Sequence, residues 1–142
     1  MKLSIPQDVY DQMIKHCQEG MPNEACGLVG GAGGGDAVAS KIYLLNNAAA
    51  SPVYYRPDDK GLLAAMNDID TNELDLVAIF HSHVASHAFP SPTDVREAHY
   101  PGVVYLIISL AGLGPDARGF LINKKDWRDD AGEIESVELV VS

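Results

Sequence analysis

The sequence has few cationic side chains and few cysteines, and both shortages exclude classes of protein. Ten Lys and Arg oppose twenty Asp and Glu, which gives a formal net charge of −10. Because nucleic-acid affinity depends on cationic side chains that neutralise phosphates, this balance argues against a nucleic-acid partner. The only two cysteines, Cys17 and Cys26, cannot form a disulfide framework, and we expect both to be thiols in a reducing compartment.

The apolar runs are too short to cross a bilayer. Leu76 to Phe80 and Val103 to Leu110 are among the longest, whereas a membrane helix needs roughly twenty residues. The first residues lack the apolar core and the cleavage site of a secretory signal. We therefore expect a cytoplasmic protein that does not bind a membrane. Hydrophobic residues make up 46% of the 142 positions, enough for one domain over residues 1–142 that folds alone.

The periodicity of the apolar residues predicts an α/β fold. The predicted helices are 6–18, 57–72 and 91–99. The predicted strands are 25–30, 37–45, 74–81, 102–109, 117–123 and 133–141, with a short extended piece at 53–55. The first two strands flank a glycine-rich segment and should form a hairpin with the glycines at its tip. This order predicts a single domain with a mixed β-sheet of about six strands flanked by helices.

Two histidines stand at the end of the predicted strand 74–81. His81 and His83 are two positions apart, so on an extended backbone their imidazoles point to the same side and can share a metal ion. Alone, such a pair is more often a polar strand end than a zinc site. After seven intervening residues, Ser91-Pro92-Thr93-Asp94 makes a good helix cap with a carboxylate in the first turn. Asp94 can also be a third ligand, which leaves one tetrahedral position open, as in catalytic zinc sites.

These residues, together with Glu24, form a known signature. Glu24, His81-Ser82-His83, seven residues and Ser91-Pro92-Thr93-Asp94 match the Glu…His-Ser/Thr-His-x7-Ser-x-x-Asp pattern of the JAMM (MPN+) metallopeptidases. The segment from Pro22 to Gly30 also resembles the strand-entry segment of small bacterial members. The likeness covers nearly the whole chain and is closest to the CysO-cysteine peptidase type, which implies the deaminase-like JAMM/MPN fold.

The resemblance assigns a role to each residue of the signature. It implies that His81, His83 and Asp94 hold one Zn²⁺ per chain. Glu24 is then the general base that takes a proton from the attacking water and gives it to the leaving amine, and Ser91 donates a hydrogen bond to the oxyanion.

The resemblance also implies a class of substrate. This is a small ubiquitin-like or sulfur-carrier protein, cut at an amide or isopeptide bond after its C-terminal Gly-Gly, with release of cysteine or of a lysine-linked target. Whether the chain forms a homodimer is left open.

Two alternatives use the same residues differently. Two histidines and a carboxylate are also the facial triad of a non-haem iron protein, an interpretation that leaves Glu24 and Ser91 without a purpose. The other alternative is a metal-free MPN-type scaffold that binds partners, and the intact ligands argue against it.

Four residues outside the signature complete the list of candidates. Cys26 is expected first of all to be a small buried hydrophobic residue. It also lies two residues from Glu24 and would face the same side of an extended segment, so an accessory role near the metal is open. His16, His87 and His99 have no position in the signature and are expected to be ordinary helix-end or exposed side chains.

Overall fold

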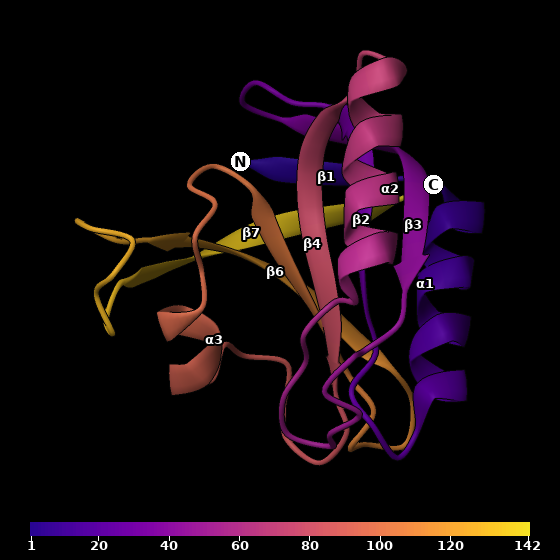
Figure 1. Cartoon of the computed structure of the whole chain (residues 1–142), viewed down its shortest axis with the longest axis vertical. Helices are drawn as coiled ribbons and strands as arrows, with labels where there is room; N and C mark the ends of the chain where they lie inside the picture. The colour runs from indigo at the N-terminus through magenta and orange to yellow at the C-terminus, as the bar shows by residue number, and fades with distance from the viewer.

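Seven strands and three helices make up the fold in the computed structural model, which describes all residues 1–142 (Figure 1). The strands are β1 (Lys2–Ile5), β2 (Cys26–Ala32), β3 (Ala37–Leu45), β4 (Asp75–His83), β5 (Val104–Ser109), β6 (Asp116–Asn123) and β7 (Glu133–Val141). The helices are α1 (Gln7–Gly20), α2 (Asp59–Thr71) and α3 (Pro92–Arg96). The predicted α/β class, with a mixed sheet flanked by helices, is confirmed.

The sheet has one strand more than predicted, and it closes on itself. Its strand order is β1-β3-β2-β4-β5-β6-β7, and β1 pairs in parallel with both β3 and β7. The missed strand, β1, has four residues, of which only Leu3 and Ile5 are buried. Two alternating residues are too short a pattern to identify a strand from sequence.

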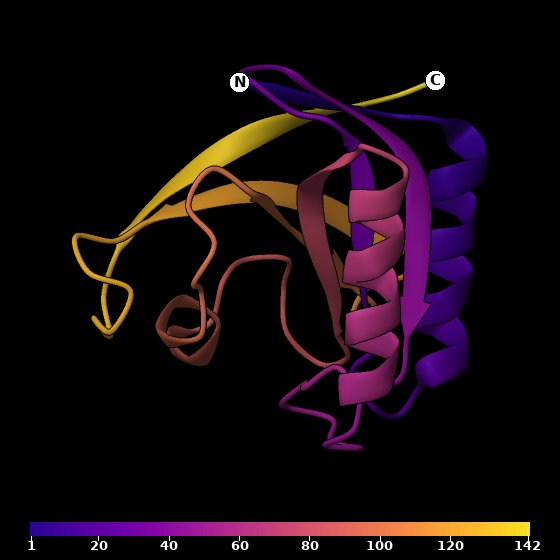
Figure 2. The same ribbon diagram turned by 45° about the horizontal axis from the view of Figure 1, so that its top comes forward.

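Residues on the two faces of the sheet belong to two separate apolar clusters. Ala78 and Phe80 of β4 pack in one cluster with the buried face of α1. Ile79, between them, packs in the other with residues of α2 and α3. In Figure 2, β3 passes between α1 and α2. Because side chains alternate along a strand, residues 81 and 83 lie on the same face of β4 as Ile79, toward α2 and α3.

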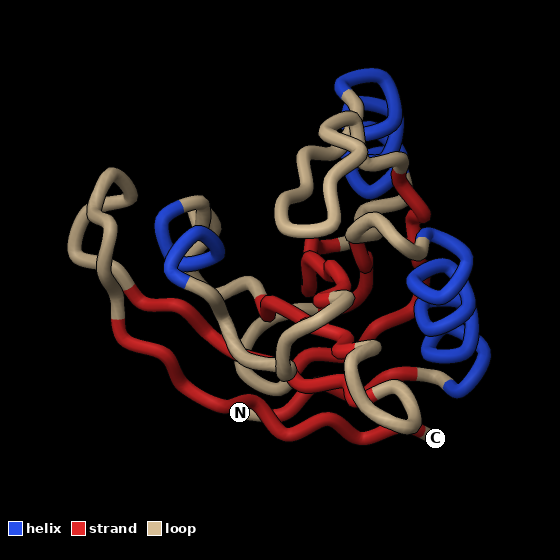
Figure 3. The backbone as a smooth tube through the Cα atoms, turned by 90° about the horizontal axis from the view of Figure 1, so that it is seen from below, coloured by secondary structure: helices blue, strands red, loops and turns tan.

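The third helix stands apart from the other two. Figure 3 shows α3 beside the loop that joins β6 to β7, on the opposite side of the molecule from α1 and α2. It ends at Arg96, earlier than the predicted end near residue 99. Lys124 donates hydrogen bonds to the carbonyl oxygens of Val95 and Arg96, so a contact distant in sequence helps to end the helix.

The hairpin and the buried strand are as predicted, with small shifts in their bounds. β2 pairs antiparallel with β3, and Gly34 and Gly35 at the tip have φ values of +90° and +87°, which glycine adopts without strain. β4 extends two residues further than predicted and therefore contains both histidines. The extended piece expected at 53–55 is irregular, although Asn47 and Pro57 beside it form an isolated bridge.

None of the three helices combines the length and the apolar character needed to span a membrane.

Close packing between β2 and its neighbours generates a stability prediction at Gly27. A Cβ atom there would overlap the Phe80 ring and the Tyr43 carbonyl oxygen, whereas Gly114 faces open space. We expect Gly27→Ala to lower the free energy of unfolding by about 3 kcal/mol and Gly114→Ala to change it by less than about 0.5 kcal/mol. Urea unfolding of both variants measures the difference. Equal stabilities would mean that the sheet relaxes around the added methyl group.

Candidate metal centre

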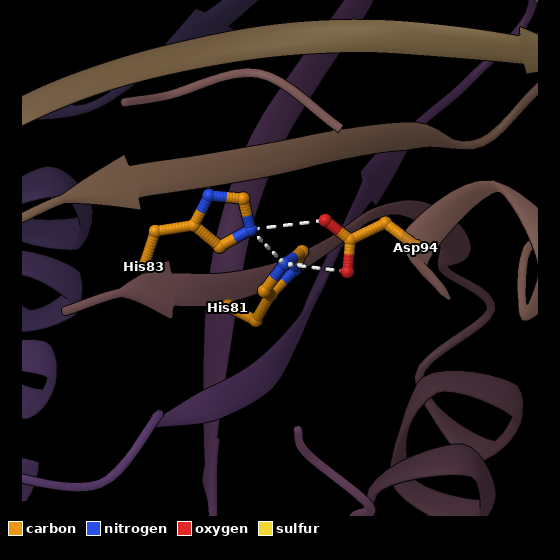
Figure 4. Close-up of side chains that lie close together, drawn as sticks. All are labelled: His81, His83 and Asp94. Atoms are coloured by element: carbon orange, nitrogen blue, oxygen red, sulfur yellow. Dashed lines mark hydrogen bonds and ion pairs between the residues drawn. The ribbon is translucent and has the colours of Figure 1, made fainter. Parts of the chain in front are cut away.

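Three side chains from two elements converge at the end of β4. His81 and His83 are both buried, and their Nε2 atoms lie 3.1 Å apart. Asp94, in the first turn of α3, places Oδ1 3.1 Å from Nε2 of His81 and Oδ2 2.9 Å from Nε2 of His83 (Figure 4). All the ligand atoms of this group lie within 4.8 Å of one another. The structure thus brings together the three residues predicted as ligands, and the group could hold a metal ion.

Hydrogen bonds behind the ligands orient His83 for such a role. Its Nδ1 donates to the carbonyl oxygen of His87 at 2.9 Å. A hydrogen bond from Nε2 to Asp94 then requires the protonated ring, and loss of that proton leaves the lone pair of Nε2 for a metal, the arrangement typical of metal-binding histidines. The His81 ring stacks on Tyr55, with ring centroids 4.5 Å apart and planes 20° apart. Its buried Nδ1 has no hydrogen-bond partner.

Asp94 is ionised despite its partial burial. Burial opposes ionisation, but hydrogen bonds with His81 and His83 outweigh it and hold the pKa of Asp94 well below its usual range. Burial likewise lowers the pKa of His83, yet Asp94 and the His87 carbonyl together raise it above its usual value. An anionic carboxylate between two imidazoles is a donor set that suits a divalent cation.

The start of α3 is a capping box that also aims Asp94. The amide of Asp94 donates to Oγ of Ser91 at 3.1 Å, and the amide of Ser91 donates to Oδ2 of Asp94 at 2.9 Å. The helix-cap and the ligand interpretations of this segment therefore hold together. Ser91 Oγ accepts a hydrogen bond here, so its own proton is free to be donated to a substrate.

Glu24 lies two residues ahead of β2. The antiparallel pairing of β2 with β4 ends at Cys26 and His81, and the amide of Ser82 still donates to the carbonyl oxygen of Ala25, so continuing this register places Glu24 near His83. Glu24 is 7% exposed. Burial raises its pKa to about 7, with His83 lowering it and Asp94 raising it further. Glu24 and Asp94 line the same pocket.

Ser82, which has no predicted role of its own, helps to hold the Glu24 segment in place. Ser82, between the two histidines, faces away from them, and its Oγ accepts a hydrogen bond from the amide of Ala25 at 2.8 Å. The amide of Ser82 donates to the carbonyl oxygen of Ala25 at 3.0 Å. The serine of the His-Ser-His triplet therefore fixes the backbone next to the acid, a role visible only once β2 and β4 are paired.

Asn47 connects Glu24 to the wall of the pocket. Its Nδ2 donates to the carbonyl oxygens of Glu24 at 3.0 Å and Tyr54 at 2.9 Å. Its Oδ1 accepts from the amides of Ala49 and Arg56. All the usual hydrogen-bonding positions of the side chain are thus filled. The sequence predicted only a connection here, because an asparagine in a loop carries no sign of its partners.

Cys26 is buried, as expected of a small hydrophobic residue, whereas His16 departs from the sequence expectation. The Cys26 thiol is not among the grouped ligand atoms; it faces the carbonyl oxygen of Asn46 at 3.9 Å, and burial raises its pKa to about 12. His16 is more than a helix tail, because its Nε2 lies 3.1 Å from the carbonyl oxygen of Cys26 and 3.0 Å from that of Leu45. It ties α1 to the ends of β2 and β3 beside the site.

The other two histidines are exposed, as predicted. His87 nevertheless contributes its backbone carbonyl to His83, and His99 lies edge-on to Trp127.

A pocket of about 180 Å³ opens beside the three grouped side chains. Its floor comes from apolar residues of the sheet and α2, and its walls from the 53–57 segment and the residues at and after α3. The lining residues are Glu24, Leu28, Val53, Tyr54, Tyr55, Arg56, Pro57, Leu62, Met66, Leu76, Ile79, Thr93, Asp94, Glu97, Tyr100 and Tyr105. An extended peptide segment could lie here against an apolar wall, within reach of Glu24.

Comparisons with known proteins agree with the resemblance noted in the sequence. The chain is 36% identical to the CysO-cysteine peptidase of Mycobacterium tuberculosis over 107 residues, 75% of this chain and 73% of that protein. It is 34% identical to a desampylase of Haloferax volcanii over 135 residues, 91% and 90% of the two chains. A solution structure of a Desulfitobacterium hafniense protein, 36% identical, superposes with a TM-score of 0.84 over 99% of this chain and 92% of that one.

The match to a family agrees with these pairwise similarities. Residues 6–128 match the family described as prokaryotic homologs of the JAB domain, a range that includes all five residues of the signature. The chain therefore belongs to the prokaryotic JAB-domain family, the JAMM-type family that its signature indicates.

Proposed function

We propose that this chain is a zinc-dependent metallopeptidase that hydrolyses an amide or isopeptide bond after the C-terminal Gly-Gly of a small ubiquitin-like or sulfur-carrier protein. The observation that carries the proposal is the convergence of His81, His83 and Asp94 opposite a buried Glu24. The relatives named CysO-cysteine peptidase and desampylase support a peptidase acting on such conjugates. The released group is cysteine or a lysine-linked target.

The donor set fits one zinc ion. Ligand atoms on a tetrahedral zinc at 2.0–2.2 Å lie about 3.3 to 3.6 Å apart. Here the two Nε2 atoms are 3.1 Å apart, and each lies 3.1 or 2.9 Å from a different oxygen of Asp94, so the group is slightly tighter than a zinc-bound set. Two imidazoles and one carboxylate leave the fourth position for water, as in catalytic zinc sites. The same triad could hold iron, but a buried acid poised at a pKa of about 7 favours hydrolysis, which needs a base.

The chain's own residues then move the proton and hold the charge. Zinc, when bound, lowers the pKa of a water molecule toward about 7 and polarises the scissile carbonyl. Glu24 accepts a proton from the attacking water and delivers it to the leaving amine, and a pKa near 7 suits both transfers. Ser91 donates a hydrogen bond from its hydroxyl group to the oxyanion. The apolar pocket beside Glu24 receives the carrier's tail.

All five residues come from one chain, so nothing in the site requires the homodimer that the sequence left open. We place the reaction in the cytoplasm, where the two free and buried thiols stay reduced. No nucleic acid takes part, in keeping with the net charge of −10.

Metal content tests the ligand set and discriminates the alternatives. We expect the purified protein to contain about one zinc per chain and Asp94→Ala to contain much less, because two imidazoles alone bind zinc weakly. Glu97→Ala, which removes another carboxylate of the same pocket, should keep its zinc. Elemental analysis measures this. Iron in the parent protein would favour the facial-triad interpretation, and no metal after zinc reconstitution would favour the scaffold.

Substitution of the base tests the mechanism. Glu24→Gln should retain zinc but lower hydrolysis of a Gly-Gly-tailed carrier bearing a C-terminal cysteine by about 10² to 10⁴-fold, the usual contribution of a general base. Glu19→Gln, an exposed acid on α1, is the control and should leave the rate unchanged. A Glu24→Gln variant with parental turnover would remove Glu24 from the mechanism.

The same variant has a readout in chelator-treated protein that needs no substrate. Between pH 4.5 and about 7 the unfolded chain ionises this carboxyl while the folded chain keeps it protonated, so the parent loses stability as the pH rises. Glutamine mimics the protonated form. The free energy of unfolding of Glu24→Gln should therefore equal that of the parent near pH 4.5 and exceed it by about 1 to 2 kcal/mol above pH 7, as measured by urea unfolding across this pH range. This difference is reduced to allow for solvent screening.

Ser91 has two roles that substitution can separate. Ser91→Ala removes both the cap and the proposed oxyanion donor, whereas Ser91→Gly costs the cap only a few tenths of a kcal/mol. We expect both variants to keep their zinc and to lose about 100-fold in turnover. Steady-state kinetics beside elemental analysis checks this. Recovery of turnover in Ser91→Gly would reduce Ser91 to a helix cap.

A further inference from the structure

The helix that carries Asp94 has little of its own to hold it in place. α3 has five residues, of which only Val95 is buried, and Ala98 just beyond it is the next buried contact. Its N-terminal end is tied by the capping box and by the contacts of Asp94 with the two histidines. Because those contacts are part of the metal centre itself, they cannot position Asp94 independently of it. A separate attachment of α3 has to come from another part of the molecule.

Lys124 attaches the other end of α3. This residue follows β6 directly, and its Nζ donates to the carbonyl oxygens of Val95 and Arg96, both at 3.1 Å. The last carbonyls of a helix lack partners within it, and an ammonium group there is favoured both as donor and as cation. The side chain is half-buried, whereas its neighbour Lys125 is exposed.

The loop 124–132, which joins β6 to β7, is shaped around this lysine. A Cβ on Gly132 would come within 2.7 Å of Cγ of Lys124 and 2.8 Å of the carbonyl oxygen of Asn123. The backbone at residue 132 thus packs directly on the stem of Lys124 and directs it. In the same loop, Trp127 lies edge-on to His99 with ring centroids 5.4 Å apart. Figure 3 shows this loop alongside α3.

We propose that Lys124 is a positioning residue for the metal centre, which holds the C-terminal end of α3 and so sets the position of Asp94 relative to His81 and His83. β4 and β6 both pair with β5, so the histidines and the end of β6 that directly precedes the lysine belong to one sheet. α3 is then fixed between two points of that sheet. The inference rests on the proposed function, because it requires a metal at these three ligands.

Matched variants of the full chain test this role. Lys124→Met keeps the stem and removes the donor, Lys124→Arg keeps a cationic donor, and Lys125→Met removes the same charge one residue away. The zinc dissociation constant is measured by competition with a chelator, and the visible absorption of Co²⁺-substituted protein reports the ligand geometry. We expect Lys124→Met to bind zinc about tenfold more weakly, with altered cobalt bands. Lys124→Arg should recover most of the affinity, and Lys125→Met should match the parent.

Gly132→Ala is the second variant and keeps the ammonium group while displacing its stem. It should weaken zinc binding in the same direction, and it tests the proposal if Lys124→Met does not fold. If Lys124→Met has the zinc affinity and the cobalt absorption bands of the parent, even with a lower unfolding temperature, Lys124 stabilises the fold but does not position the metal centre. An equal loss in Lys125→Met would reduce the effect to net charge, and either result overturns the proposal.

Failure of this inference is distinguishable from failure of the proposed function. None of these measurements uses a carrier substrate. A parent protein that binds zinc but cleaves no Gly-Gly-tailed carrier would overturn the peptidase and leave the role of Lys124 standing. A parent protein that binds neither zinc nor cobalt would overturn both.

Discussion

The antiparallel pairing of β2 with β4 is the constraint on which the site depends. The register that sets Cys26 against His81 brings Glu24 near His83, and the backbone beyond Cys26 is extended by the reciprocal bonds between Ala25 and Ser82. A slip of one residue would turn both histidines to the α1 face and Ser82 to the pocket, because side chains alternate along a strand. Close packing at Gly27, against Phe80 and Tyr43, resists such a slip.

The surroundings of Asp94 and Glu24 shift the pKa values of these two carboxyl groups in opposite directions. Asp94 is tied by hydrogen bonds to two imidazoles and to the Ser91 amide, which keep its pKa low in spite of burial. Glu24 has no side-chain hydrogen bond comparable to these, and burial raises its pKa to about 7. Pairs of titratable groups with divergent pKa values commonly divide the roles of a site between them. Here the permanent anion is suited to a metal and the poised acid to proton transfer.

Local patterns predicted the parts of this site but not the contacts that hold them. The spacing of His81 and His83 and the cap Ser91-Pro92-Thr93-Asp94 are short-range signals that made the three converging residues candidates, and the family signature assigned them as ligands. The fourth candidate, Glu24, came from the family signature, because an isolated acid has no pattern of its own. β1 was missed because four residues carry too little periodicity. Ser82 and Lys124 act through partners from 28 to 57 residues away in sequence, and Asn47 joins its own loop to Glu24, 23 residues away. Nothing near these residues in the chain indicates the distant partners.

One loop connects the wall of the pocket to Glu24 and to His81. Asn47 is bonded at once to the backbone of Glu24 and to the backbone of Tyr54 and Arg56 in the pocket wall, while Tyr55 between them stacks on His81. The amide of Glu24 also donates to the carbonyl oxygen of Ser51 in the same loop. Residues 54–56 therefore belong to a segment whose hydrogen bonds reach Glu24 and whose Tyr55 ring covers His81. Because filled hydrogen bonds and close packing leave such a segment few alternative arrangements, this loop helps to hold Glu24 and His81 in place.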